Sequence, residues 1–357
     1  MSKIIALALA WVCGLAAAQE LPGDAGTPDA VAAHEGRLVI YAATDERLVA
    51  PLIRDFQTLY PDLQVDYLDM NSAELYRRFL AETATGGNAD VTWSSAMDLQ
   101  VKLVNDGHAQ PHRSAETAAL PAWASWKDEA FGTTYEPIAI AYNKRLLRKD
   151  EVPATHAELI RLLKEQPERF RGRLTTYDPV RSGLGFMLHT QDQQANPVVF
   201  WNLVGAMGTA GLHGRASTSA MLDRIAAGDA LLGYNVLGSY ALERARNDPA
   251  LGVVLPQDYT LVMSRVMFIA RQARHPHAAR LWVDYVLSQR GQAVLANRAG
   301  LFSIRDDVAG ETTAARLKGQ LGGALRPIPI GTGLLTYLDQ MKRRDFLRKW
   351  DAAVQPR

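Results

Sequence analysis

The chain has 357 residues, and its 39 Lys and Arg against 38 Asp and Glu give a formal net charge of +1 at pH 7. This balance provides no overall field for nucleic acid or for an anionic membrane surface, so we expect no nucleic-acid partner. An apolar content of 48% is that of an ordinary globular protein. The length exceeds one comfortable hydrophobic core, which indicates two domains.

The first residues have the pattern of a secretory signal peptide. Lys3 precedes a short apolar run over residues 4–15, and residues 16–18 are alanines that form a small-residue cleavage site. The run is too short for a permanent membrane anchor. We therefore expect a signal peptide over residues 1–18, cleavage after Ala18, and a periplasmic protein.

Cys13 is the single cysteine of the chain and lies inside this segment. Residues 10–12 before it are bulkier than a lipidated export signal requires, so we interpret Cys13 as one more apolar residue. Cleavage after Ala18 leaves a mature chain without cysteine. That excludes thiol catalysis, disulfides and cysteine-bound zinc.

Residues 19–35, rich in Ala, Pro, Gly and Asp, predict a flexible leader. Short β-rich runs and amphipathic helical segments alternate after it. The expected strands are 37–42, 64–68 and 89–93. The expected helices run over 44–59, from an N-cap at Ser72 to 80, and over 97–105. Alternation of this kind is typical of a mostly parallel sheet covered by helices.

The alternation continues through the middle of the chain. Further strands are expected over 138–142, 173–177, 231–235 and, as one longer run, 262–269. Further helices are expected over 155–164, 182–191, 220–227, 276–288 and 292–297. We therefore predict two α/β lobes. Lobe 1 comprises 36–137 with about 265–325, lobe 2 comprises 138–264, and a C-terminal helical segment covers 326–357.

Several turns that follow the predicted strands contain residues suited to a polar ligand. In open parallel α/β sheets, ligands bind beyond the carboxyl ends of the strands, where helix N-termini offer free N–H groups. The turns that fit contain Thr44 with Asp45, Ser94 with Ser95, residues 177–183 and residues 234–240. Hydroxyls, amides, tyrosines and glycines dominate them. Such turns are better suited to holding a ligand than to transforming it.

Ser182 combines two compatible roles. It is a candidate N-cap, while Gly183 permits close approach and Arg181 adds a charge to the N–H groups of the helix start. Thr44 is expected to give a hydroxyl contact only, because Asp45 beside it would repel an anion. Ser72 is interpreted as a plain N-cap.

The motifs of common catalytic and metal sites do not occur in the sequence. It has no H-E-x-x-H pair, no G-x-S-x-G elbow, no phosphate-binding P-loop and no G-x-G-x-x-G after a strand. We therefore expect no enzyme activity, no catalytic residues, no cofactor and no metal. An exported hydrolase stays a third hypothesis, which requires a nucleophile or a metal.

Short motifs along the chain follow one another in a familiar order. They are residues 39–45, the helix end at 56–61, residues 89–91 with Ser94 and Ser95, residues 135–143, and Asp178 and Pro179 with Ser182 and Gly183. In order and spacing they resemble the family 1 extracellular solute-binding proteins of ABC importers, more specifically the ferric-iron and sugar-phosphate branch.

The resemblance implies a two-lobed α/β fold of the type II periplasmic-binding-protein kind, each lobe a mostly parallel sheet flanked by helices. Crossovers near 136–143 and 263–269 would join the lobes, and the ligand would lie in the cleft that closes between them. Carried over by position, the cleft would include Thr44, Ser94, Ser95, Tyr135, Asp178, Ser182, Gly183, Tyr234 and Asn235. Arg181 and Arg265 are the candidate counter-charges, although Arg265 equally fits an ordinary position on a crossover strand.

One departure from the family bears on the ligand. The iron-binding members hold their metal with an adjacent tyrosine pair, whereas here Tyr234 and Tyr240 are separated and no adjacent pair occurs. This favours a small organic anion, either a phosphorylated metabolite or a carboxylate. We predict a monomeric binding component that serves an inner-membrane ABC permease. The alternatives are a ferric-iron-binding protein and a sensor subunit that reports to a membrane histidine kinase.

Overall fold

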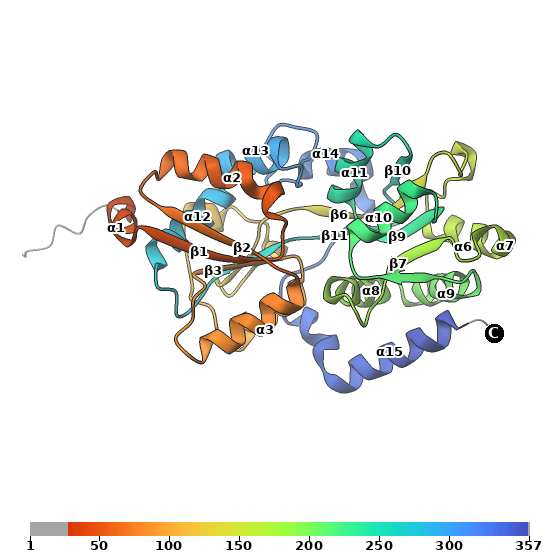
Figure 1. The fold of residues 1–357 in the computed structure, drawn as a ribbon, viewed down its shortest axis with the longest axis horizontal. Coiled ribbons are helices and arrows are strands. Elements are labelled where there is room, and N and C mark those ends of the chain that lie inside the picture. Colours follow the sequence, from red (N-terminus) through yellow and green to blue (C-terminus); the bar gives the residue numbers. More distant parts are fainter. Residues whose placement is uncertain (1–27, 356–357) are drawn as a thin grey trace, which may run out of the picture.

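The computed structural model describes residues 28–355 and has two α/β lobes side by side (Figure 1). The predicted signal peptide, its cleavage site and Cys13 lie outside the described residues. Among the helices of the described part, none is both long enough and apolar enough to span a bilayer.

The first lobe is built on a six-stranded sheet of order β2-β1-β3-β12-β5-β4. Its strands are β1 (Arg37–Ala42), β2 (Gln64–Asp69), β3 (Val91–Ser94), β4 (Ser125–Trp126), β5 (Ala130–Gly132) and β12 (Val266–Ile269). Its helices are α1 (Pro28–Glu35), α2 (Glu46–Leu59), α3 (Ser72–Thr83), α4 (Met97–Asn105), α5 (Ala115–Ala118), α12 (Pro276–Leu287) and α13 (Gln289–Arg298). The core of this lobe contains the buried rings of Phe56, Trp93 and Trp282.

The second lobe is built on a sheet of order β13-β11-β6-β9-β7-β8, with β10 paired to β6. Its strands are β6 (Glu136–Asn143), β7 (Leu174–Tyr177), β8 (His213–Arg215), β9 (Leu232–Leu237), β10 (Leu251–Val254), β11 (Thr260–Met263) and β13 (Leu325–Pro327). Its helices are α6 (His156–Glu165), α7 (Pro167–Phe170), α8 (Gly183–Ala195), α9 (Pro197–Thr209), α10 (Thr218–Ala227) and α11 (Gly238–Asn247). The helix α14 (Ala314–Leu321) packs in a separate buried cluster with Tyr135 and Val262.

The chain crosses between the lobes at sharply defined points. It leaves the first sheet after Gly132 and enters the second at Glu136, and it returns between Met263 and Val266. The expected run over 262–269 is therefore two strands, one in each sheet. In Figure 1, β6 and β11 lie side by side between the lobes, as their antiparallel pairing requires.

The C-terminal segment, expected to be helical over 326–357, begins in β13 and then contacts both lobes. The 3-10 helix η4 (Thr332–Leu338) contacts α4 of the first lobe. The helix α15 (Gln340–Val354) packs on α9 of the second lobe, which it underlies in Figure 1.

Three local expectations need correction. The leader is not flexible throughout, because α1 is a helix whose Glu35 accepts hydrogen bonds from the backbone N–H groups of His277 and Ala278 (3.2 and 2.8 Å) at the start of α12. The N-cap of α3 is Asn71, whose side chain accepts from the Glu74 N–H, and not Ser72. The parallel order holds for β1–β3, for β7–β9 and for β11 with β13, whereas the crossover strands β6, β11 and β12 also form antiparallel pairs, so both sheets are mixed.

Candidate functional site

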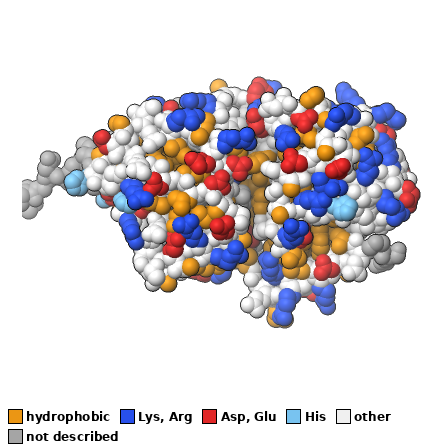
Figure 2. All heavy atoms as spheres, viewed as in Figure 1, with side chains coloured by type: hydrophobic (Ala, Val, Ile, Leu, Met, Phe, Trp, Pro, Cys, Tyr) orange, Lys and Arg blue, Asp and Glu red, His pale blue; other side chains and the backbone are white. Residues whose placement is uncertain are grey.

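A cavity of about 590 Å³ lies between the two lobes and takes its lining from both. Figure 2 shows the furrow between the two halves of the molecule. Lobe 1 provides the segments that follow β1, β2 and β3, and lobe 2 provides those that follow β7, β8 and β9. The site therefore lies where the carboxyl ends of parallel strands from both sheets meet, as the fold rule predicts.

Several helices begin at this cavity. The starts of α3, α8 and α10 carry the N-caps Asn71, Ser182 and Ser217, whose side chains accept the N–H groups of Glu74, Gly185 and Ala220 at 2.9, 3.0 and 3.2 Å. All three caps line the cavity, as does Leu237 immediately before α11. Each helix start retains further free N–H groups and the positive end of the helix dipole. Their convergence from two lobes makes this the natural place for an anion.

Charged side chains of both signs also line the cavity. Arg77 comes from α3 in lobe 1 and Arg181 from the loop before α8 in lobe 2. Neither guanidinium has an ion-pair partner among the residues that the structure describes. Asp45 and Asp69 line the lobe 1 side, where Asp69 accepts the Glu46 N–H at 3.0 Å. A ligand that spans the cavity therefore meets an available cation from each lobe.

Arg265 forms the floor of the cavity. Its guanidinium donates from Nε to Oε1 of Glu136 at 2.7 Å and from Nη1 to the hydroxyl of Thr44 at 2.7 Å. The Tyr240 ring centroid lies 5.6 Å from the guanidinium carbon. Arg265 thus lines the cavity, but its charge is already paired within the protein, and its role as a counter-charge for a ligand stays a prediction.

The structure brings most of the predicted residues to this region. Ser95, Arg181, Ser182, Gly183 and Arg265 line the cavity itself. Thr44 lies between the lining residues Ala43 and Asp45 and bonds to Arg265.

Ser94 and Asp178 lie directly behind the lining. The hydroxyl of Ser94 accepts the Ala96 N–H at 3.2 Å and donates to the Ser72 hydroxyl at 3.3 Å. The carboxylate of Asp178 accepts the N–H groups of Val180 and Arg181 at 2.8 and 3.2 Å. Asp178 therefore shapes the loop that carries Arg181 and does not line the cavity itself.

Three predicted residues are not brought to the cavity. Tyr135 packs its ring 5.7 Å from that of Trp123 in a separate cluster. Tyr234 donates its hydroxyl to buried Asp192, and Asn235 lies with its Nδ2 3.2 Å from Nδ1 of His189. The reason is that β9 extends to Leu237, so these two residues lie within the strand and not at its end.

The prediction also missed several lining residues. Tyr177 and Tyr240 lie in turns that the sequence had indicated, but neither was chosen as a site residue. Ser217 lines the cavity with Thr218 and Ser219, and a run of hydroxyl residues before a predicted helix was the available signal. Arg77 had no such signal, because it lies inside α3 and not in the turn that precedes this helix.

The electrostatics of the tyrosines bear on metal binding. Burial raises the pKa of both Tyr177 and Tyr240, which opposes ionisation of their hydroxyls. Tyr177 also bonds to the Thr218 hydroxyl. Over the residues that the structure describes, no three His, Cys, Asp or Glu side chains group as metal ligands would.

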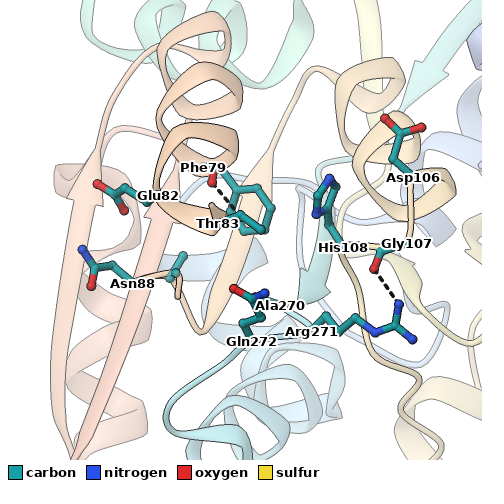
Figure 3. Close-up of a pocket in the computed structure, with 12 residues that line it drawn as sticks. Phe79, Glu82, Thr83, Asn88, Asp106, Gly107, His108, Ala270, Arg271 and Gln272 are labelled. Carbon is teal, nitrogen blue, oxygen red and sulfur yellow. Dashed lines mark hydrogen bonds between the residues drawn. The ribbon is translucent and has the colours of Figure 1, made fainter. Parts of the chain in front are cut away.

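A second, smaller cavity of about 180 Å³ lies wholly in lobe 1 (Figure 3). It is bounded by the ends of α3 and α4 and by the segment after β12, where Arg271 donates to the Gly107 carbonyl at 3.2 Å. The rings of Phe79 and His108 meet edge to face, 5.8 Å apart, on one side. Because no lobe 2 residue lines it, the relative position of the lobes cannot alter this cavity directly.

Comparison with known proteins gives one family match and a consistent set of similar folds. A sequence profile described as bacterial extracellular solute-binding protein matches residues 51–318. The substrate-binding protein of an ABC transporter from Agrobacterium tumefaciens is 41% identical over 89% of this chain and 94% of that one, with a TM-score of 0.83.

Two more distant structures share the fold. AfuA from Actinobacillus pleuropneumoniae, with fructose-6-phosphate bound, is 18% identical over 89% of this chain and 98% of its own, with a TM-score of 0.73. Iron-bound HitA from Pseudomonas aeruginosa is 15% identical over 89% of this chain and 99% of its own, with a TM-score of 0.68. At these identities the likeness concerns the fold alone.

Proposed function

Because the chain belongs to the bacterial extracellular solute-binding protein family and is a substrate-binding protein of an ABC transporter, we propose that its ligand is a small polar organic anion. The proposed ligand is a phosphorylated metabolite or a carboxylate, which the protein carries as a monomer in the periplasm to an inner-membrane permease. One observation carries the proposal: helices from both lobes begin at one cavity, and each lobe adds an arginine that has no ion-pair partner among the described residues. Cleavage after Ala18 stays a prediction, which N-terminal sequencing of the exported protein checks.

The cavity has the chemistry that an oxyanion requires. Backbone N–H groups and the hydroxyls of Ser182 and Ser217 supply short, directed donors, and each helix start favours a negative charge by about 0.3–1 kcal/mol, more when it is partly buried. Phosphate and carboxylate groups accept such donors on two or three oxygens at once. A neutral ligand would use the same hydroxyls and accept hydrogen bonds from the arginines, but it would gain no charge pairing with them.

Closure of the lobes follows from the same arrangement. Arg77 and Arg181 approach the cavity from opposite lobes, so an anion that bonds to both gains its full contact only when the lobes close. A permease that binds the closed form more tightly then distinguishes the loaded protein from the empty one, because only differential affinity shifts such an equilibrium.

Ferric iron is the alternative raised by relatives such as iron-bound HitA. Tyr177 and Tyr240 line the cavity and could supply oxygen ligands. Fe³⁺ is held by tyrosines as phenolates, and burial raises the pKa of both hydroxyls in the metal-free protein. A trivalent cation would also be repelled by Arg77 and Arg181, which have no ion-pair partner among the described residues, so the cavity supports an organic anion better than a metal.

A thermal-shift screen followed by calorimetry tests the proposal. The panel contains sugar phosphates, phosphonates, di- and tricarboxylates and ferric citrate. We expect a phosphorylated or carboxylated compound to raise the melting temperature, and Arg77→Ala and Arg181→Ala each to weaken its binding by about tenfold to a hundredfold. Arg113→Ala, an exposed arginine paired with Asp128 outside the cavity, is the control that should leave affinity unchanged. Stabilisation by ferric citrate alone, or unaltered affinity in both cavity variants, contradicts the proposal.

A further inference from the structure

The floor of the interlobe cavity contains a buried ion pair between Arg265 and Glu136. Arg265 lies between β11 and β12, and Glu136 is the first residue of β6, so each partner comes from one of the two crossover segments. Their side chains are 1% and 0% exposed, yet Arg265 lines the cavity. The pair thus lies where the ligand space meets the connection between the lobes.

The carboxylate of Glu136 is surrounded by donors. It accepts from Nε and Nη2 of Arg265 at 2.7 and 3.3 Å and from the Thr134 hydroxyl at 2.9 Å. The hydroxyl of Ser239, in the first turn of α11, also donates to it. Arginine stays protonated in proteins. The two-point bond to the Glu136 carboxylate therefore cancels the positive charge of Arg265 at close range.

Carboxylates offset the arginines around the cavity when this pair is included. Arg77, Arg181 and Arg265 line the cavity together with Asp45 and Asp69. Glu136 lies directly behind Arg265, and Asp178 lies behind the lining in the loop that carries Arg181. The cavity therefore offers many directed donors but no net positive formal charge.

We infer that Glu136 is a specificity-determining residue, which masks the charge of Arg265 and so adapts the cleft to anions of low net charge. The inference rests on the proposed anion-binding function. Glu136→Gln keeps the size of the side chain and an oxygen to accept from Arg265, but it removes the negative charge. Because Coulomb energy grows with the ligand charge and is strong at short range in a partly desolvated site, the change favours dianions over monoanions.

A charge cycle at this pair tests the inference. Calorimetry compares the unaltered protein, Glu136→Gln, Arg265→Gln and the double variant, with inorganic sulfate as a dianion and inorganic phosphate at pH 5 as a monoanion. We expect Glu136→Gln to bind sulfate at least about tenfold more tightly and to raise the preference for sulfate over phosphate. Of the four proteins, Arg265→Gln should bind sulfate most weakly. The double variant should have the same preference for sulfate over phosphate as the unaltered protein.

Glu151→Gln is the matched control, since it removes a carboxylate from an ion pair with Arg169 in lobe 2, outside the cavity. It should leave both affinities unchanged. Sulfate binding by folded Glu136→Gln that is no tighter than that of the unaltered protein overturns the inference. If Glu136→Gln does not fold, comparison of the double variant with Arg265→Gln measures the same effect. Sulfate binding by the double variant that is no tighter than that of Arg265→Gln overturns the inference equally. Anion binding that is insensitive to Glu136 contradicts only this inference, whereas the absence of anion binding in every form contradicts the proposed function as well.

Discussion

Replacing Asp98 with asparagine should stabilise the protein more at alkaline pH than at acidic pH. Asp98 is the second residue of α4, directly behind the cavity turn that contains Ser95. It is 4% exposed, and its carboxyl group accepts the Leu99 N–H at 2.9 Å, with no ion-pair partner among the described residues. Burial raises its pKa from 3.8 to about 7.

Proton linkage gives the direction and the size of this pH dependence of stability. Because the folded-state pKa is the higher one, the buried carboxylic acid costs nothing below pH 4, and stability is lost as the pH rises from about 4 to about 7. One pKa unit corresponds to about 1.4 kcal/mol, so a folded pKa near 7 predicts a loss of roughly 2–3 kcal/mol between pH 5 and pH 8. Asparagine resembles the protonated acid in shape and has no proton to lose.

Urea unfolding at pH 5 and pH 8 measures the effect. The free energy of unfolding of Asp98→Asn, taken relative to the unaltered protein, should rise by about 2–3 kcal/mol between the two pH values. Asp106→Asn, at the exposed end of the same helix where the carboxylate pairs with Lys102, is the control and should show no comparable rise. An equal difference at both pH values would refute the reasoning, because it would mean that Asp98 is ionised in the folded protein across the whole range.

Three further substitutions probe the packing behind the cavity and its lining. Gly185→Ala places a Cβ 2.2 Å from the Cβ of Tyr177, so α8 must move away from β7. We expect the free energy of unfolding in urea to fall by roughly 1–3 kcal/mol and anion binding to weaken. Gly205→Ala is the control, because its Cβ meets open space and should not destabilise the protein. Ser182→Ala removes the N-cap of α8 and should lower the free energy of unfolding by about 1 kcal/mol, together with a measurable loss of anion affinity. A loss of stability with unchanged affinity would mean that Ser182 is only a helix cap. Tyr234→Phe leaves buried Asp192 with one tyrosine donor fewer, so the free energy of unfolding should fall by about 1–3 kcal/mol. Anion affinity, measured by calorimetry, should stay unchanged. A fall in affinity would mean that Tyr234 belongs to the binding site.

Much of the fold could be predicted where the sequence has a clear period. The strand β1 and the helix α4 have the bounds that their hydrophobic pattern indicated. The helix α9 was missed because its apolar residues occur on all sides of the helix and show no amphipathic period. This pattern is expected for a helix that packs against several neighbours, here α6, α8 and α15. The docking of α1 was also hidden, because the hydrogen bonds of Glu35 join it to residues more than 200 positions away.

The site could be predicted only to the level of turns. The rule that ligands bind at strand ends pointed to the segments around Ser95, Ser182 and Tyr240, and all three line the cavity. The predicted strand ended two residues before β9 does, and with the carry-over from the family this selected Tyr234 instead of Tyr240. Arg77 could not be found, since it lies inside α3 and not in a turn that follows a strand.

Charge balance gives this cleft a particular way to discriminate among ligands. If recognition relied on net charge, any small dianion would bind, and the exposed part of the interaction would be strongly screened by salt. Here the carboxylates of Asp45, Asp69, Asp178 and Glu136 offset the three arginines, so affinity must come from directed donors, the guanidinium groups of Arg77 and Arg181 among them. A site that depends on directed donors rejects an analogue lacking the matching acceptors, because its own buried groups are then left unpaired. We therefore expect selectivity among anions of equal charge to exceed selectivity for charge itself.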